Sequence, residues 1–168
     1  CYVESDKFFT ELEIDNPVLW NAEEPFLYEL EILLKNKLDQ SHHIVKKIGI
    51  RDIGIKQDVL YINHSPIKLR GINHHDIDYQ NGRALTIADY QRDIELMKRA
   101  NINTVRTSHY PPSPNFIELC DKMGLYVICE VPFGKGEKHL HDDSYIENLL
   151  QRADSTVMRD KNNPSVII

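Results

Sequence analysis

The feature that most constrains the fold is an alternation of apolar strands with amphipathic helices from about residue 68 onward. The strands are apolar along nearly their whole length, which is typical of a parallel sheet covered by helices. The pattern predicts three strand–helix units followed by a fourth strand. The expected strands are residues 68–73, 104–107, 125–129 and 165–168.

Each expected helix begins with a residue that can cap it, and Gly124 ends the second. The caps are Thr86 with Asp89 three residues later, Ser113 followed by Pro114, and Ser144 with Glu147 three residues later. Apolar residues at helical spacing predict a buried face on the first and third helices. These faces comprise Ile87, Tyr90, Ile94 and Met97, and Ile146, Leu149, Leu150, Ala153 and Val157.

Two α/β architectures fit this order: a doubly wound open sheet and the first half of a (β/α)8 TIM barrel. No glycine-rich phosphate loop follows any strand, which disfavours a nucleotide-binding open sheet. Polar residues follow three successive strands, as in a barrel whose function lies at the carboxyl ends of its strands. Because a full barrel takes about 250 residues, we expect residues 58–168 to be the N-terminal half of one.

Residues 1–57 have a different, β-type pattern. Residues 8–14, 26–34 and 42–55 are expected to be strands, the last bent at Gly49, and residues 58–69 predict a hairpin. Short antiparallel strands separated by turn residues indicate a β-sandwich. Three strands are too few to bury two sheet faces, so this part is expected to be the C-terminal end of a sandwich domain.

Composition excludes several kinds of partner. The 168-residue chain has a net charge of −6 and no run rich in Lys or Arg. Nucleic acid and anionic membranes are therefore not expected partners. No apolar stretch approaches the length of a membrane span.

The cysteines bear on the compartment. Cys1, Cys120 and Cys129 are odd in number and lack metal-type spacing, which predicts buried thiols in a reducing compartment. No signal peptide is visible, and these two observations favour the cytoplasm. The first residue is not Met, which is typical of a chain that has lost its N-terminus.

Polar side chains gather where the first three expected strands end, and we expect them on one rim of the barrel. They are Asn73, His74, His75 and Asp76, then Arg106, Thr107, Ser108, His109 and Tyr110, and finally Glu130. The guanidinium of Arg106 suits a carboxylate, either as a structural partner of Glu130 or in support of catalysis. His75 and His109 can donate to sugar hydroxyls, whereas His74 is expected to be a surface turn residue.

The rim does not contain an obvious pair of catalytic carboxylates. Glycoside hydrolysis normally uses two, about 5 Å apart in retaining enzymes. The candidates are Glu130, Asp76 and Asp78. No second carboxylate stands at the end of a further strand. A metal site built from Glu137, His139 and His141 is an alternative, although a solvated polar loop is the simpler interpretation.

Several stretches of the sequence resemble one family. The longest covers residues 103–128 and contains Arg106-Thr107-Ser108-His109-Tyr110-Pro111. It resembles, without a gap, the signature of glycoside hydrolase family two, which includes β-galactosidases, β-glucuronidases and β-mannosidases. Residues 16–28, 69–76 and 159–168 are also similar to the family, so the resemblance covers nearly the whole chain.

The resemblance implies an immunoglobulin-like domain followed by a TIM barrel in a retaining glycosidase. In this family a Glu after the fourth strand is the acid/base and a Glu on a later strand is the nucleophile. Both are expected beyond Ile168, so the chain alone is expected to be inactive. The resemblance assigns substrate binding to His75 and His109 and support of the catalytic carboxylates to Arg106, and it matches Glu130 to a conserved acidic position. We also expect Asn73 and Asp76 to bind substrate and Glu130 to support catalysis, because they lie at the same strand ends.

The favoured activity is cleavage of terminal β-D-galactosides, with β-glucuronidase as the alternative. A non-catalytic carbohydrate-binding protein and a metal-dependent hydrolase are the interpretations from other classes. The best-known β-galactosidases hold magnesium with a Glu-x-His pair four residues beyond the position of Glu130. Here Glu137 and His139 restore that pair only through a three-residue insertion, which leaves the metal open. The resemblance is compatible with Mg²⁺ or Na⁺ in the full enzyme and with a homo-oligomer.

Overall fold

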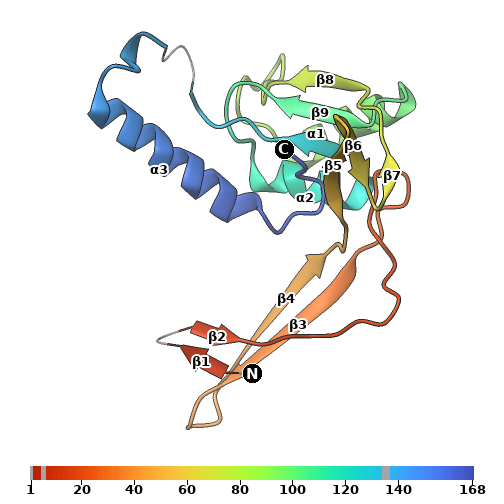
Figure 1. Cartoon of the computed structure of the whole chain (residues 1–168), viewed down its shortest axis with the longest axis vertical. Coiled ribbons are helices and arrows are strands. Elements are labelled where there is room, and N and C mark those ends of the chain that lie inside the picture. The colour runs from red at the N-terminus through yellow and green to blue at the C-terminus, as the bar shows by residue number, and fades with distance from the viewer. Residues whose placement is uncertain (1, 5–6, 134–136) are drawn as a thin grey trace.

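The fold was analysed in a computed structural model that describes residues 2–4, 7–133 and 137–168 (Figure 1). The N-terminal strands are β1 (Tyr2–Glu4), β2 (Lys7–Phe9), β3 (Tyr28–Lys35), β4 (Ser41–Ile48), β5 (Ile53–Lys56), β6 (Val59–Ile62) and β7 (Ser65–Pro66). The remaining elements are β8 (Gly71–His74), α1 (Ile87–Arg99), β9 (Thr104–Thr107), α2 (Pro114–Met123), β10 (Tyr126–Ile128), the 3-10 helix η1 (Glu137–His139) and α3 (Asp143–Asp160).

The strands β8, β9 and β10 form a parallel sheet in which β9 is central. Residues 165–168 continue this sheet beside β10. The amide of Val127 donates to the carbonyl of Ser165 over 2.8 Å, and the amide of Ile167 donates to the carbonyl of Val127 over 3.0 Å. The predicted order of four parallel strands is therefore confirmed, and within the described residues the sheet does not close into a barrel.

Helices α1 and α2 cover one face of this sheet, and the apolar residues between the helices and the sheet form a hydrophobic core. Tyr90, Ile94 and Met97 of α1 are buried as predicted, whereas Ile87 is 56% exposed. The predicted capping box of α1 is present, with the Asp89 amide donating to the Thr86 hydroxyl. The helix α2 begins with Pro114 after Ser113, whose side chain makes no capping bond, and ends at Gly124 in the left-handed conformation.

The helix α3 differs from its prediction at both its start and its face. Its N-cap is Asp142, whose carboxylate accepts from the amide of Ser144 over 2.9 Å, so the predicted cap at Ser144 is wrong. The side chain of Asp142 thus satisfies the amide of the second helical residue, as an N-cap residue does. Leu150 and Val157 of the predicted buried face are 65% and 57% exposed. Figure 1 shows the reason, since α3 extends away from the sheet and approaches it at its C-terminal end.

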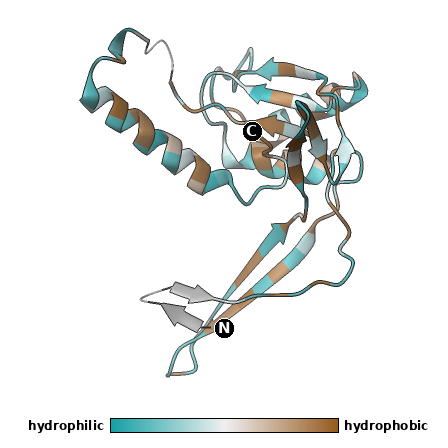
Figure 2. Ribbon diagram, viewed as in Figure 1, coloured by the Kyte–Doolittle hydropathy of each residue, from teal (hydrophilic) through white to brown (hydrophobic). Residues whose placement is uncertain are grey.

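The N-terminal part is built from antiparallel pairs: β1 with β2, β3 with β4, and β6 with both β5 and β7. The predicted hairpin within residues 58–69 is confirmed. The predicted single strand 42–55 is wrong, because β4 ends at Ile48 and β5 belongs to another sheet. The break falls where the backbone of Gly49 passes Pro164 so closely that a Cβ would lie 2.6 Å from its Cγ. Figure 2 shows apolar residues along both β3 and β4, and several of them are exposed.

Trp20 joins the N-terminal part to the sheet. Its side chain is fully buried, meets the ring of Tyr126 edge-on at 5.8 Å, and donates through Nε1 to the carbonyl of Asp121 over 2.8 Å. Lys98 of α1 adds a second link by donating to the carbonyls of Ala22 and Gly124, both over 2.8 Å. The two parts thus share one continuous packed region.

The described cysteines fit the predicted buried thiols. Cys120 is fully buried and Cys129 is partly buried, and neither forms a disulfide. Cys1 lies outside the described residues. In the described part of the chain no helix combines the length and the apolar character that crossing a bilayer requires.

Candidate functional site

The register of the parallel sheet brings the predicted rim residues together. Asn73 of β8 lies beside Arg106 of β9, which in turn lies beside Ile128 of β10. Because all three strands run in the same direction, the residues that follow them emerge at one edge of the sheet. His75, His109 and Glu130 are among these residues.

Arg106 is the centre of the rim. Its Nη2 lies 2.6 Å from Oε2 of Glu130, and its Nη1 donates to Oδ1 of Asn73 over 3.3 Å and to Oγ of Ser108 over 3.4 Å. One guanidinium therefore links the ends of β8, β9 and β10. The Arg106 side chain is 40% exposed, so it also remains accessible from the open side of the sheet.

Glu130 is held between two basic side chains. Its Oε1 lies 2.9 Å from Nδ1 of His109, and its amide donates to the hydroxyl of Thr107 over 3.0 Å. The Oε2 oxygen is buried, and its neighbour is the guanidinium of Arg106 at ion-pair distance. Each carboxylate oxygen of Glu130 therefore faces one of the two basic side chains.

The two predicted sugar-binding histidines meet at the rim. The rings of His75 and His109 lie edge to face with centroids 5.7 Å apart, and Tyr110 lies 6.2 Å from His75. The peptide bond between Ser108 and His109 is cis. Arg83 lies over the Tyr110 ring at 5.1 Å, which adds a cation to this aromatic cluster.

Asp76 points away from the rim toward α2. Its Oδ2 accepts from the amide of Ser113 over 3.3 Å, and its own amide donates to the hydroxyl of Tyr110 over 3.1 Å. Burial raises the pKa of the neighbouring Tyr90 hydroxyl, and the charge of Asp76 adds to the effect. Through these contacts Asp76 connects the loop after β8 to the loop after β9.

His74 is buried, so its prediction as a surface turn residue is wrong. Its side chain is 8% exposed, stacks on the ring of Phe116 at 4.7 Å, and lies 3.1 Å from Oδ2 of Asp93 through Nε2. The cause is the alternation of side chains along a strand. Asn73 and His75 point to one face of the sheet, which leaves His74 on the face covered by helices.

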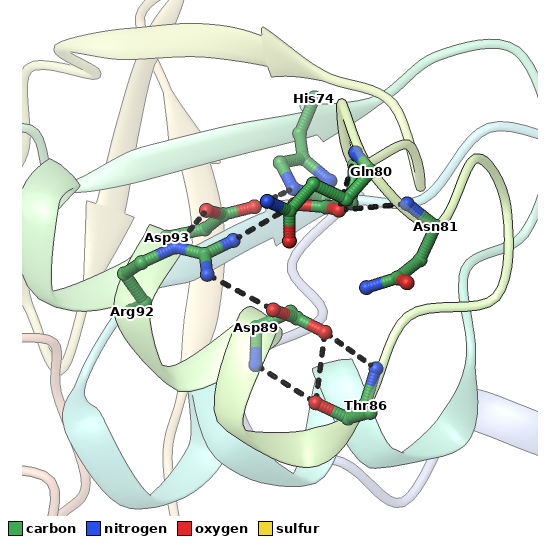
Figure 3. Close-up of polar contacts among 8 residues, drawn as sticks. His74, Gln80, Asn81, Thr86, Asp89, Arg92 and Asp93 are labelled. Carbon is green, nitrogen blue, oxygen red and sulfur yellow. Dashed lines mark hydrogen bonds and ion pairs between the residues drawn. The ribbon is translucent and has the colours of Figure 1, made fainter.

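Sequence reasoning missed a network of carboxylates behind the rim (Figure 3). Arg92 of α1 pairs with Asp89 over 2.9 Å, with Asp78 over 3.4 Å and with Asp93 over 3.7 Å. Asp93 then joins this group to His74. The available signal was helical spacing, because Asp89 and Asp93 lie four residues apart on one side of α1.

The candidate metal ligands do not form a site in the described part of the chain. His139 and His141 are exposed, and the ring of His139 lies against Tyr145 at 5.4 Å. The side chain of Glu137 lies outside the described residues. Among the residues that are described, no three His, Cys, Asp or Glu side chains are grouped as metal ligands would be.

A hollow of about 1010 Å³ lies away from the rim and is lined by residues of β3, β4, α2 and the end of α3. None of the rim residues lines it. At the rim, Arg106 forms an ion pair with Glu130 and His109 lies 2.9 Å from the same carboxylate, and within the described residues neither side chain pairs with another carboxylate.

Comparison with known proteins agrees with this architecture. The model of the glycosyl hydrolases family 2 TIM barrel domain matches residues 53–168, and that of glycosyl hydrolases family 2 matches residues 2–51. The chain belongs to glycosyl hydrolase family 2. The expected fold class, an immunoglobulin-like β-sandwich end followed by the start of a TIM barrel, is confirmed. The domain boundary at residue 57 stays a prediction.

Relatives within glycosyl hydrolase family 2 have two different names. The chain is 35% identical to a β-galactosidase of Staphylococcus xylosus over 94% of its length, and 39% identical to one of Lactococcus lactis over 96%. It covers 17% of each of these enzymes. The crystal structure of a β-glucuronidase of Parabacteroides merdae superposes with a TM-score of 0.87, at 28% identity, over 96% of this chain and 20% of that one.

Proposed function

We propose that this chain belongs to a retaining glycosidase that cleaves terminal β-D-galactosides, and that it supplies the side chains that position the sugar. The observation that carries the proposal is Glu130 held between Arg106 and His109 at the ends of parallel strands. In the proposed mechanism a Glu attacks the anomeric carbon, and a second Glu protonates the leaving oxygen and then activates water. Both carboxylates come from polypeptide outside these 168 residues.

The rim supplies the hydrogen bonds that a sugar needs. Nδ1 of His109 is used by Glu130, and this contact fixes the ring so that Nε2 faces a substrate hydroxyl. Arg106 orients Glu130 and leaves donors for a developing negative charge. Asn73 is held beside Arg106 and completes the set of polar groups.

A β-glucuronidase of the same family is the second candidate. Its support is that solved structures of that name superpose closely on this chain, including one from Dictyoglomus thermophilum with a TM-score of 0.84 at 33% identity. A galactoside and a glucuronide differ in the charge carried at C6. The two candidates are therefore distinguished by substrate rather than by mechanism.

The test compares the 168-residue chain with the longer enzyme that contains it, using 4-nitrophenyl β-D-galactoside and β-D-glucuronide. We expect the longer enzyme to hydrolyse the galactoside and the chain alone to hydrolyse neither. Turnover by the chain alone would contradict the proposal. Sugar binding by the longer protein without hydrolysis would indicate a binding protein, and loss of activity on chelation with one zinc bound would indicate a metal-dependent hydrolase.

A further inference from the structure

His74 occupies a position that the proposed function does not use. It is the last residue of β8, and its imidazole lies between two carboxylates that belong to different elements. Nε2 is 3.1 Å from Oδ2 of Asp93 in α1, and Nδ1 is 3.7 Å from Oδ1 of Asp76 in the loop after β8. Nδ1 is buried and, within the described residues, forms no hydrogen bond.

The surroundings of the ring fix its orientation. The ring of Phe116 in α2 stacks on it at 4.7 Å with only 9° between the planes. Nε2 lies within hydrogen-bonding distance of Asp93, whereas Nδ1 faces Asp76 at 3.7 Å, a distance that allows an electrostatic contact without a hydrogen bond. Asp93 in turn is held by Arg92, which also binds Asp89 at the start of α1 (Figure 3). The imidazole is thus connected to a rigid helix on one side.

On its other side, His74 is connected to both loops of the rim. Its carbonyl accepts from the amide of Ser108 over 2.9 Å. Asp76, which faces Nδ1, accepts from the amide of Ser113 and donates its own amide to Tyr110. These contacts define the paths of residues 75–76 and 108–113, which carry the two rim histidines.

We propose that His74 is a positioning residue: through Asp93 and Asp76 it couples α1 to the rim loops and so sets where His75 and His109 meet the sugar. The last clause rests on the proposed glycosidase function. The coupling between α1 and the rim loops does not depend on that function, because it follows from contacts within this chain.

The coupling is tested by hydrogen exchange in the 168-residue chain. His74→Phe keeps a ring against Phe116 and removes both nitrogens. We expect the amides of Asp76 and Ser113 to exchange about ten-fold faster, while the core amide of Val127 changes by less than about three-fold. Equal acceleration of all three amides would mean that His74 only stabilises the fold, and would overturn the proposal.

A second variant and a control separate the network from the fold. Asp93→Asn weakens the link to α1 and is expected to accelerate the same rim amides. Asp89→Asn, in the same helix and also bound to Arg92, has no direct contact with His74 or the rim loops among the described residues and should affect all amides alike. Acceleration of the rim amides by Asp89→Asn alone would contradict the assignment to His74.

The effect on the sugar is measured in the longer enzyme. His74→Phe should lower kcat/KM for the nitrophenyl galactoside about ten-fold or more, largely through KM, and Asp89→Asn should leave both constants unchanged. Unchanged kinetics in His74→Phe would overturn the positioning role. If the wild-type enzyme hydrolysed neither substrate, the proposed function would fail, and hydrogen exchange would still decide whether His74 holds the rim loops.

Discussion

At the scale of single residues, Arg106 links the ends of three strands through Asn73, Ser108 and Glu130. Together with His109, it holds the carboxylate of Glu130 at the rim. A partly exposed ion pair of this kind contributes little to stability, so we expect its loss to be seen in catalysis rather than in folding.

Arg106→Ala is therefore expected to lower kcat of the longer enzyme by about two orders of magnitude or more, with the urea midpoint of unfolding nearly unchanged. Arg106→Lys is the control, because it keeps the charge and loses the planar fork of donors. The kcat of Arg106→Lys should lie between that of the wild type and that of Arg106→Ala. An unchanged kcat in Arg106→Ala would return this residue to a purely structural role.

Cys129 provides a prediction about pH. Burial raises the pKa of its thiol to about 11, and the adjacent Asp160 carboxylate adds to the shift. Since the thiolate is the reactive form, Cys129 should react slowly with iodoacetamide at pH 8 and faster as the pH approaches 11. The raised pKa stabilises the fold below the usual thiol pKa of 9.0, and this contribution is lost as the pH rises toward 11.

The measurement is alkylation of each cysteine, followed by mass spectrometry between pH 7 and the onset of unfolding. Asp160→Asn removes a negative charge, so it should lower the pKa of Cys129 and speed its alkylation at pH 8. The fully buried Cys120 is the internal control for unfolding. Reaction of Cys129 at the rate of an unfolded thiol at pH 8 would contradict its burial.

The residues of the rim could be predicted from sequence because their positions depend on the ends of strands. The direction of a side chain depends also on what covers the strand. His74 and His75 are neighbours in sequence, yet one is buried against Phe116 and the other meets His109 at the rim. Only the packing of α1 and α2 on the sheet distinguishes them, which is why the burial of His74 and the role of Asp93 were missed.

At the scale of elements, three glycines show how local conformation and packing combine. Gly124 ends α2 with φ of +77°, and a Cβ there would lie 2.2 Å from the carbonyl oxygen of Ala22. Gly82 has φ of +59° with nothing within 4 Å of a Cβ, and Gly54 has neither constraint. Gly82 thus has only the strained backbone conformation, whereas Gly124 has both that conformation and the steric overlap, so comparing the two distinguishes these effects.

Replacing each glycine with Ala should give three graded losses in the free energy of unfolding. We expect almost no loss at Gly54, roughly 1 kcal/mol at Gly82 from the left-handed conformation, and clearly more at Gly124, where the backbone of residue 22 must also move. Urea unfolding followed by circular dichroism measures all three. Equal losses at Gly82 and Gly124 would show that the contact with Ala22 is not part of the folded state.

Element boundaries were predictable where the signal is local. The capping box of Thr86 and Asp89 lies within four residues, and α1 begins where it predicts. The start of α3 was missed because Asp142 and Ser144 both offer a cap and the sequence does not rank them. The single strand predicted for residues 42–55 failed for a non-local reason, the close approach of Gly49 to Pro164.

For the whole molecule, the sequence pattern and the packing divide the chain differently. The patterns change near residue 57, and the two family models meet between residues 51 and 53. The packing crosses both positions, because Trp20 is buried against Tyr126 and Arg51 donates to the carbonyls of Pro164 and Val166. The position at which the sequence pattern changes therefore does not divide the chain into two parts that are stable independently of each other.

Removal of residues 1–57 should consequently destabilise the barrel part. Full burial of a large apolar side chain contributes about 3 kcal/mol, and each lost hydrogen bond about 1 kcal/mol more. Against a typical stability of about 5–15 kcal/mol, the loss of Trp20 and Arg51 together should leave residues 58–168 without a cooperative thermal transition by circular dichroism.

Two controls test whether the loss of stability comes from the contacts of Trp20 and Arg51 with the barrel part. A chain that lacks only residues 1–14 keeps Trp20 and should unfold cooperatively, because the described side chains of residues 10–14 are exposed. Arg51→Met in the whole chain removes the bonds to residues 164 and 166 and keeps much of the apolar contact, so its transition should stay cooperative with a midpoint below that of the whole wild-type chain. If residues 58–168 unfolded as sharply as the whole chain, the barrel part would fold independently of residues 1–57, and the buried Trp20 would stabilise only the N-terminal part.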